Sequence, residues 1–431
     1  MDAEILILLA SFITLLVLRV PIAFCIGIST ALTIYAVGDV PTGYVVAQRM
    51  STGIASFPLL AIPFFVLAGL LMKEGGMASR LMDMANALVG RYRGGLCYVN
   101  TVTCMLFGAV SGSATAAVSS IGGFMIPEMA RKGYSKEFSV ALTTASATTG
   151  LLIPPSNIMI VYAVVAGNVS VAALFMAGIL PGLLMGLLIM TAAWFSVRKA
   201  GNHLQSSNLP TTSLPKALLG ALPSLLLVII VLGGILGGVF TPTEASAIAV
   251  AYALLLGIVV HREVKLADIP RILLQSVKTT SIVMILVGAS QAMSWVLAYE
   301  SVPQTVSNAL LQISENPIIT LLIINALLLV VGTFMDMTPA VLIFTPIFLP
   351  VVIDLGVSPV HFGILLIANL CIGLCTPPVG TCLFVGCSVG GIPIDRLVKP
   401  LLPIFGAMVI GLLLITYVPQ LSTWLPGILG L

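Results

Sequence analysis

Long apolar runs separated by short polar stretches dominate the pattern of this chain. A helix that crosses a membrane needs about 20 mainly apolar residues, within a range of roughly 17–25. Five runs in each half approach or exceed that length, and they cover residues 5–18, 22–37, 54–72, 138–166 and 171–197, then 217–239, 245–260, 272–298, 360–389 and 401–418. The pattern therefore predicts an all-α polytopic membrane protein with about five membrane-spanning helices in each half.

Two further apolar segments, 96–129 and 318–353, carry polar residues at their centres, SGSAT in the first and MDMT in the second. We judge each segment too short to cross a membrane twice. Non-helical backbone at membrane depth is tolerated where protein buries it or where it lines a wet cavity. Both segments are therefore expected to be re-entrant helical hairpins, which enter and leave on the same side.

Consecutive prolines interrupt two of the long runs, in LIPPSN within 138–166 and in CTPPVGT within 360–389. Proline has no N–H to donate and clashes with the carbonyl one turn back, so a proline pair leaves backbone carbonyls without partners. In hydrocarbon such carbonyls need protein, water or an ion. The two runs are thus expected to be broken helices, and the breaks are candidates for a binding site.

The two halves repeat each other at a fixed spacing, because the difference between Pro377 and Pro154 is 223 residues. The same offset pairs further residues without gaps: Thr115 with Thr338, Pro127 with Pro350, Gly133 with Gly356, Ser135 with Ser358, Gly150 with Gly373, and Gly167 with Gly390. Five crossings in a half is an odd number, so the second copy must enter the membrane from the opposite face. An inverted repeat of two halves is predicted.

The repeat divides the chain into two units and a linker. The first repeat is expected at 1–199, with scaffold helices at 1–93, a hairpin at 95–130, a broken helix at 138–167 and a helix at 170–199. A cytoplasmic linker follows at 200–216. The second repeat is expected at 217–431, with scaffold helices at 217–298, a hairpin at 317–353, a broken helix at 360–390 and a helix at 400–418.

Charge is scarce and unevenly placed. Only 8% of the residues are charged and 59% are apolar, against about 25% charged in a typical soluble protein, and a formal net charge of +3 indicates no nucleic-acid partner. With the N-terminus outside, 17 of the 18 basic residues fall on the inner side and only Arg49 falls outside, as the positive-inside rule requires. The outer loops instead carry acidic residues: Asp39, Glu300, Glu315 and Asp354. Both termini are therefore expected on the outer side of the membrane.

The four interruptions, two hairpin tips and two breaks, are expected to meet near the middle of the membrane. Helix N-termini that begin after each interruption offer free N–H groups and a partial positive charge, which suit an anion. Carbonyls freed by the proline pairs suit a small cation. The sequence places no lysine or arginine in the membrane core. Helix ends, hydroxyls and bound cations are therefore expected to neutralise the carboxylate of a substrate.

The candidate residues lie at or beside these interruptions. For the substrate they are Ser113, Ala114, Thr115, Ser156, Asn157, Thr338, Val379, Gly380 and Thr381. For a metal ion they are Ser111, Ser113, Gly150, Pro154, Asp336, Thr338, Gly373, Thr376 and Pro377.

Asp336 occupies the position that matches Ser113 and has two interpretations. It could cap the helix that follows, as a structural residue. It could instead contribute directly or indirectly to a sodium site, because a carboxylate inside a membrane costs about 2.5–3.5 kcal/mol and by default marks an ion or proton path. We favour the sodium role.

Other polar residues have structural interpretations. Glu244 is expected to stabilise the first turn of a helix with Thr241 or Thr243 as its cap, and Asn325 and Asn369 are expected to join helices by hydrogen bonds. His261 and His361 are expected at the membrane interface. Two amphipathic segments are expected to lie flat at an interface and to cradle a moving domain, with apolar faces formed by Met77, Leu81, Met84 and Leu88 and by Val302, Val306, Leu310 and Ile313.

The motifs GAVSGSATA, LIPPSN, GGVFTPTEAS, FMDMTPA and CTPPVGT together resemble the large membrane subunit of the tripartite ATP-independent periplasmic (TRAP) transporters, over the whole chain. The resemblance implies an elevator-type ion-transporter fold and sodium-coupled uptake of an organic acid, such as a sugar acid like sialic acid or a C4-dicarboxylate. It implies a bacterial inner membrane, a periplasmic substrate-binding protein and a small membrane subunit, here expected as a separate chain. About two sodium ions with a monoanion would make uptake electrogenic, gaining about 2.3 kcal/mol per net charge and 100 mV.

Three rival functions remain at this point. A proton-coupled carrier of the same fold would use Asp336 as its proton site. An intramembrane enzyme has little support, since the sequence has no HExxH motif and no histidine at membrane depth beside Ser111 or Ser113. A channel is conceivable, but matching breaks in two inverted halves favour alternating access.

Overall fold

The computed structural model describes residues 3–38, 40–92, 94–167, 169–199, 213–314, 316–377 and 379–431, and in these ranges the regular structure is entirely helical. Most of the linker expected at 200–216 lies outside the described residues, as do Asp39, Arg93 and Glu315. The first half contains α1 (Ala3–Val17), α2 (Ile22–Val37), α3 (Thr42–Ile54), η1 (Phe57–Leu60), α4 (Ala61–Glu74), α5 (Met77–Val89), α6 (Gly95–Ser111), α7 (Ala114–Arg131), α8 (Lys136–Thr149), η2 (Gly150–Leu152), α9 (Asn157–Ala166) and α10 (Val171–Lys199). The second half contains α11 (Leu214–Leu236), α12 (Pro242–Leu254), η3 (Leu255–Val260), η4 (Leu266–Asp268), α13 (Ile269–Tyr299), α14 (Val302–Ile313), α15 (Pro317–Phe334), α16 (Met337–Asp354), α17 (Pro359–Gly373), α18 (Thr381–Gly390), α19 (Ile394–Tyr417) and α20 (Gln420–Ile428).

Many of these helices are long enough to cross a membrane. Eight of those in the described ranges are long and apolar enough to cross a membrane, and α8 with α9, bent by 48° at the first proline pair, makes a ninth span. Both α15 and α16 belong to the eight, at 18 residues each. Each of the two helices within 318–353 is thus long and apolar enough to cross a membrane, and the expectation that this segment is a re-entrant hairpin stays a prediction.

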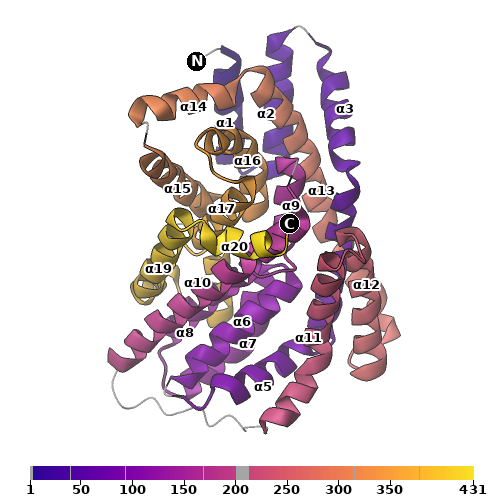
Figure 1. Ribbon diagram of the computed structural model, residues 1–431, viewed down its shortest axis with the longest axis vertical. Coiled ribbons are helices and arrows are strands. Elements are labelled where there is room, and N and C mark those ends of the chain that lie inside the picture. Colours follow the sequence, from indigo (N-terminus) through magenta and orange to yellow (C-terminus); the bar gives the residue numbers. More distant parts are fainter. Residues whose placement is uncertain are drawn as a thin grey trace.

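The 223-residue offset reappears in the helix boundaries. Adding it to the first and last residues of α7 (114 + 223 = 337, 131 + 223 = 354) gives the bounds of α16. Adding it to the start of α10 (171 + 223 = 394) gives the start of α19. In Figure 1 the matched helices α5 and α14 lie at opposite ends of the long axis of the molecule.

One predicted span has a different form. Residues 54–72 are not a single helix, because α3 ends at Ile54 and a 3₁₀ turn precedes α4. Pro58 contributes to the interruption, because a proline has no N–H to donate to the carbonyl of Ile54 and its ring would clash with that carbonyl. The chain leaves the helical conformation at Ser56, where ψ is 124°. The corresponding part of the second half is the uninterrupted α13. The sequence analysis missed α3 as a helix of its own.

The C-terminal α20 was also missed, and it changes the surroundings of His361. The imidazole is buried, with Nδ1 2.6 Å from the Oγ of Ser422 on α20. His361 is thus covered by α20 inside the protein, and its expected place at the membrane interface stays a prediction.

Three expectations about polar residues are confirmed. Glu244 and Thr241 form a capping box in which the backbone N–H of Thr241 donates to the Glu244 carboxylate at 2.8 Å. Asn369 on α17 donates to the Oδ1 of Asn325 on α15 at 2.8 Å, and Asn325 donates to the Oγ1 of Thr416 on α19 at 2.9 Å. The asparagines therefore join three helices inside the molecule.

The two amphipathic helices bury less than the sequence predicted. Met77, Leu81 and Met84 of α5 are buried, but Leu88 is 41% exposed. In α14 Ile313 is 67% exposed. Each apolar face thus ends one turn before the sequence pattern suggested.

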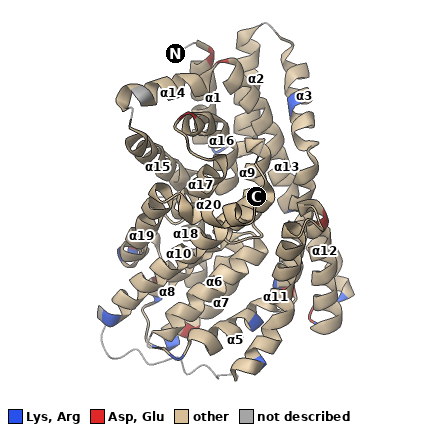
Figure 2. Cartoon of the chain, in the orientation of Figure 1, with Lys and Arg blue, Asp and Glu red and all other residues tan. Residues whose placement is uncertain are grey.

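Charged residues concentrate at the two ends of the long axis. Figure 2 shows Lys and Arg gathered at the lower end, around α5 and the start of α11, and acidic residues near the N-terminus at the upper end. At the lower end Arg271 pairs with Glu74 at 2.9 Å and Arg80 pairs with Glu263 at 2.8 Å. These ion pairs join α4 and α5 of the first half to segments of the second half.

Candidate functional site

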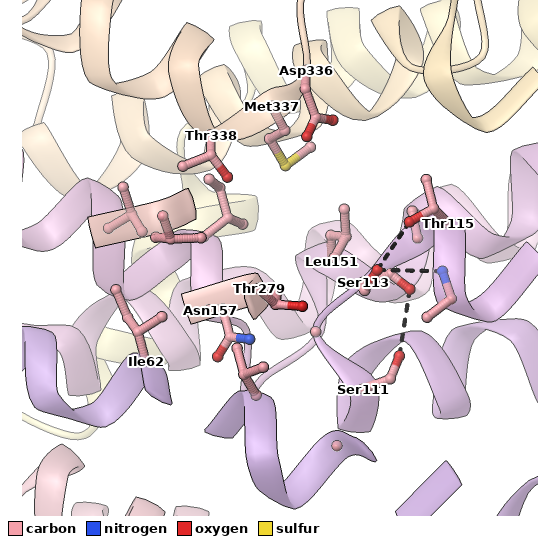
Figure 3. A pocket seen from close by; sticks show the side chains of 18 of the residues that line it. Ile62, Ser111, Ser113, Thr115, Leu151, Asn157, Thr279, Asp336, Met337 and Thr338 are labelled. Carbon is pink, nitrogen blue, oxygen red and sulfur yellow. Dashed lines mark hydrogen bonds between the residues drawn. The ribbon is translucent and has the colours of Figure 1, made fainter. Parts of the chain in front are cut away.

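A cavity of about 410 Å³ lies where residues of both halves meet. Its polar and charged lining comes from Lys73, Ser111, Ser113, Thr115, Asn157, Thr279, Asp336 and Thr338. Its apolar lining includes Ile62, Val66, Leu70, Leu151, Ile158, Val161, Ile282, Val283, Leu286, Met337, Leu374 and Cys382. The cavity therefore joins the hairpins and broken helices to a wall made by α4 and α13 (Figure 3).

The first hairpin tip presents hydroxyl groups to this cavity. Gly112, between α6 and α7, has φ +61°, a left-handed conformation that favours glycine. Ser113 then caps α7, because its Oγ accepts from the backbone N–H of Ala116 at 3.2 Å. The same oxygen lies 3.1 Å from the Oγ1 of Thr115 (Figure 3).

The first break lies directly against this tip. Residues 153–156 are not helical, and α9 begins at Asn157. A Cβ added at Gly112 would lie 2.6 Å from the Nδ2 of Asn157, so the amide touches the tip. The hydroxyl of Ser156 is buried and finds no hydrogen-bond partner among the described residues, which leaves one polar atom of the break available.

The second tip and second break meet in the same way. The backbone N–H of Gly380 donates to the carbonyl of Thr333 at 3.0 Å, and the Oγ1 of Thr381 donates to the Oδ1 of Asp336 at 3.4 Å. Asp336 occupies the N-cap position of α16, but its side chain makes no capping hydrogen bond. Its carboxylate is instead exposed to the cavity, so the capping role suggested by the sequence is absent.

Glycine pairs hold each hairpin against its broken helix. A Cβ at Gly150 would lie 2.6 Å from the Cα of Gly108, and a Cβ at Gly373 would lie 2.6 Å from the Cα of Gly332. Small residues allow helices in membranes to approach at backbone distance. The two crossings place each tip beside its break.

Helix N-termini converge on the cavity. Its lining includes residues from the first turns of α7 (Thr115), α9 (Asn157), α16 (Thr338) and α18 (Cys382). The first turn of a helix carries unpaired N–H groups and a partial positive charge. Four such ends favour an anion in the cavity.

The two broken helices also touch each other at equivalent residues. The thiol of Cys371 on α17 donates to the carbonyl of Thr148 on α8 at 3.1 Å, and these residues are 223 apart (371 − 148 = 223). Residues that are equivalent under a twofold rotation touch each other only beside the rotation axis.

The structure brings some of the candidate residues to the cavity and leaves others behind it. Those that line it are Ser111, Ser113, Ala114, Thr115, Asn157, Asp336 and Thr338. Those absent from its lining are Gly150, Pro154, Ser156, Gly373, Thr376, Pro377, Val379, Gly380 and Thr381.

The sequence analysis missed the wall formed by α4 and α13. Lys73 and Thr279 belong to it, so a lysine from the last turn of α4 lines the cavity. The repeat could have indicated this wall, because the segments that form α4 and α13 correspond at the 223-residue offset (61 + 223 = 284).

Comparison with known proteins identifies the family. Residues 9–421 match the family described as "Tripartite ATP-independent periplasmic transporter, DctM component". The chain belongs to the DctM family of TRAP transporters. The recognition made from the sequence motifs is thereby confirmed, and this large permease is a polytopic membrane transporter subunit.

Relatives that the permease resembles along most of its length carry several substrate names. It is 42% identical to the isethionate TRAP transporter permease protein DctMQ of Oleidesulfovibrio alaskensis, over 98% of this chain and 66% of that protein. It is 39% identical to the C4-dicarboxylate TRAP transporter large permease protein DctM of Pseudomonas aeruginosa, over 94% of each chain. It is 40% identical to the sialic acid TRAP transporter large permease protein SiaM of Vibrio cholerae, over 88% of each chain.

A solved structure shares the fold. The YdaH transporter of Alcanivorax borkumensis superposes with a TM-score of 0.59 at 14% identity, over 88% of this chain and 86% of that one. At this identity the likeness concerns the arrangement of helices alone.

Proposed function

We propose that this TRAP permease carries an organic acid into the bacterial cell together with sodium ions, across the inner membrane. The observation that carries the proposal is the convergence of the first turns of α7, α9, α16 and α18 on one cavity. Those helix ends favour a carboxylate or sulfonate. Substrates of this chemistry appear in the names of its relatives: isethionate, C4-dicarboxylate and sialic acid.

Sodium is proposed as the coupling ion, with about two ions per turnover. A proline in a helical run removes a backbone hydrogen bond to the carbonyl one turn earlier, and carbonyls released in this way coordinate sodium in transporters with broken helices. The unpartnered Ser156 hydroxyl supports a cation at the first break, and the Asp336 carboxylate supports one at the second tip. Each net positive charge moved inward gains about 2.3 kcal/mol per 100 mV.

Two inverted halves and an elevator motion are proposed as the mechanism. The offset shared by α7 and α16, the opposite placement of α5 and α14, and the contact of Thr148 with Cys371 all support the inverted repeat (Figure 1). The glycine crossings support hairpins and broken helices that move together as one body. The α4 and α13 wall then belongs to the stationary scaffold.

The proposed assembly has three parts: this permease, a small membrane subunit that packs on the scaffold, and a periplasmic protein that delivers the acid. The family description itself is tripartite. Both termini are proposed to be periplasmic, because this orientation leaves 17 of the 18 basic residues on the cytoplasmic side. Figure 2 shows the N-terminus at the end opposite the basic lower end, which supports the proposal for that terminus.

Uptake into proteoliposomes tests the proposal. The permease and its small subunit are reconstituted, the binding protein is placed outside, and labelled succinate, isethionate or N-acetylneuraminate is supplied. An inward sodium gradient is expected to drive accumulation of one acid, and choline in place of sodium is expected to abolish it. Uptake that ignores sodium but collapses with the pH gradient would instead favour a proton-coupled carrier with Asp336 as the proton site, an alternative that rests on the exposure of this carboxylate to the cavity.

A further inference from the structure

Lys73 is one of two charged residues in the lining of the cavity, and Asp336 is the other. It lies in the last turn of α4 and is half-buried. The charged residues beside it are already paired, Glu74 with Arg271 and Arg80 with Glu263. Within the described part of the chain Lys73 itself makes no ion pair, so a half-buried lysine without a charged partner lines the cavity.

The position of Lys73 relative to the first hairpin tip follows from Gly69. A Cβ at Gly69 would lie 3.0 Å from the carbonyl oxygen of Ser111, so α4 touches the tip at this residue. Lys73 is four residues further on, on the same face of the helix and about 6 Å along its axis. Lys73 therefore follows the tip along α4, toward the end of the helix beside Arg271 and His261.

We propose that Lys73 forms a second anion subsite in the cavity, on the α4 wall, which binds the acid group of the substrate on its way between the hairpin tips and the basic end of the molecule. The inference rests on the proposed function, since it takes the ligand to be an organic acid. The helix ends at the tips provide fixed partial charges, whereas Lys73 provides a full charge on a flexible stem. Thr279, on the neighbouring α13, lines the same wall, and its hydroxyl donates to the carbonyl of Gln275 at 3.1 Å (Figure 3).

Binding to the purified full-length chain tests this subsite without requiring transport. Thermal unfolding is followed while succinate, isethionate or N-acetylneuraminate is titrated, because a ligand that binds the folded state raises the unfolding temperature. The variants are Lys73→Gln, Lys73→Met and Lys73→Arg. Lys278→Gln is the matched control, since Lys278 is an exposed lysine on α13 outside the cavity lining.

At least one acid is expected to bind the wild type. Both neutral variants are expected to bind it roughly tenfold more weakly, which corresponds to about 1.4 kcal/mol, while Lys73→Arg and the control stay within about twofold. The difference is expected to shrink in high salt, because salt screens a partly exposed charge. Two neutral variants are made so that, if one of them fails to fold, the affinity of the other can still be compared with that of the wild type.

Equal affinity in the wild type and the neutral variants overturns the subsite, and so does the absence of binding by all three acids. Failure of the proposed function would be seen in the uptake assay, which is a separate measurement from this binding assay. Acid binding that depends on Lys73, combined with uptake that ignores sodium, would refute sodium coupling and leave the subsite standing.

Discussion

Substitution of Gly150 by alanine tests whether the close packing of α6 against the first break is needed for stability and uptake. Gly150 has φ −60°, which alanine adopts without strain, so the added methyl group acts through contact alone. Its Cβ would lie 2.6 Å from the Cα of Gly108 and 3.0 Å from the N of Ala109. Carbon atoms in contact normally lie about 3.5–4.0 Å apart, so α6 must move away from the first break by about 1 Å.

The cost of that movement follows from packing. Overpacking a well-packed interior by a methyl group typically costs about 1–3 kcal/mol, and α6 carries the tip residue Ser111 with it. A shift of about 1 Å in a positioned binding group can cost on the order of 100-fold in rate. Gly150→Ala is therefore expected to lower the unfolding temperature and to reduce sodium-driven uptake by at least about tenfold.

Gly123→Ala is the matched control, because Gly123 lies in α7 of the same hairpin and a Cβ there meets nothing within 4 Å. It is expected to retain wild-type uptake and to keep or raise stability, since alanine favours the helix. Purified protein is assayed by thermal unfolding and then by uptake in proteoliposomes. Wild-type values for both measurements in Gly150→Ala would refute the account of the glycine crossing.

Three further predictions concern polar groups. Asp336→Asn is expected to weaken the sodium dependence of uptake while expression stays intact, and an unchanged sodium stoichiometry would remove Asp336 from the ion site. Asn369→Leu breaks the link to Asn325 and is expected to lower the free energy of unfolding by roughly 1 kcal/mol; an unchanged denaturation midpoint in detergent would show that the link contributes nothing. Burial and then the nearby Arg80 lower the pKa of His261, so the folded state binds fewer protons there than the unfolded state, and the stability due to this group is present above about pH 6.5 and is lost as the pH falls toward the lowered pKa. His261→Gln is expected to flatten the dependence of the unfolding temperature on pH in that window, and an unaltered profile would contradict the assignment.

The hairpins and breaks could be predicted from the sequence because their signals are local. Proline pairs and polar residues inside apolar runs have few explanations in a membrane. Because the two halves match at a constant offset, each of these signals occurs once in each half. The helix boundaries of α7 and α16 differ by the same number that separates Pro154 from Pro377. Glu244 and the asparagine pair were likewise predictable, since capping and inter-helix hydrogen bonding depend on residue type and immediate context.

The rest depended on packing that no local pattern encodes. In the sequence, Lys73 is an ordinary positive charge at a helix end. Its place in the cavity depends on the approach of Gly69 to Ser111. The sequence around His361 does not show that α20 covers this residue. Thr381 and Gly380 lie near a break as predicted, but they bond to Asp336 and Thr333 and do not themselves line the cavity.

The central claim is that the acid binds where the helix ends of both halves converge. The most direct measurement is thiol labelling of single cysteines at Thr115 and Thr338, in a background without the native cysteines, with Gly123→Cys as the control. These two positions lie in the first turns of α7 and α16 and line the cavity from opposite halves. The transported acid with sodium is predicted to protect both cysteines from a maleimide and to leave the control unaffected. Equal labelling of both with and without the acid would contradict the claim.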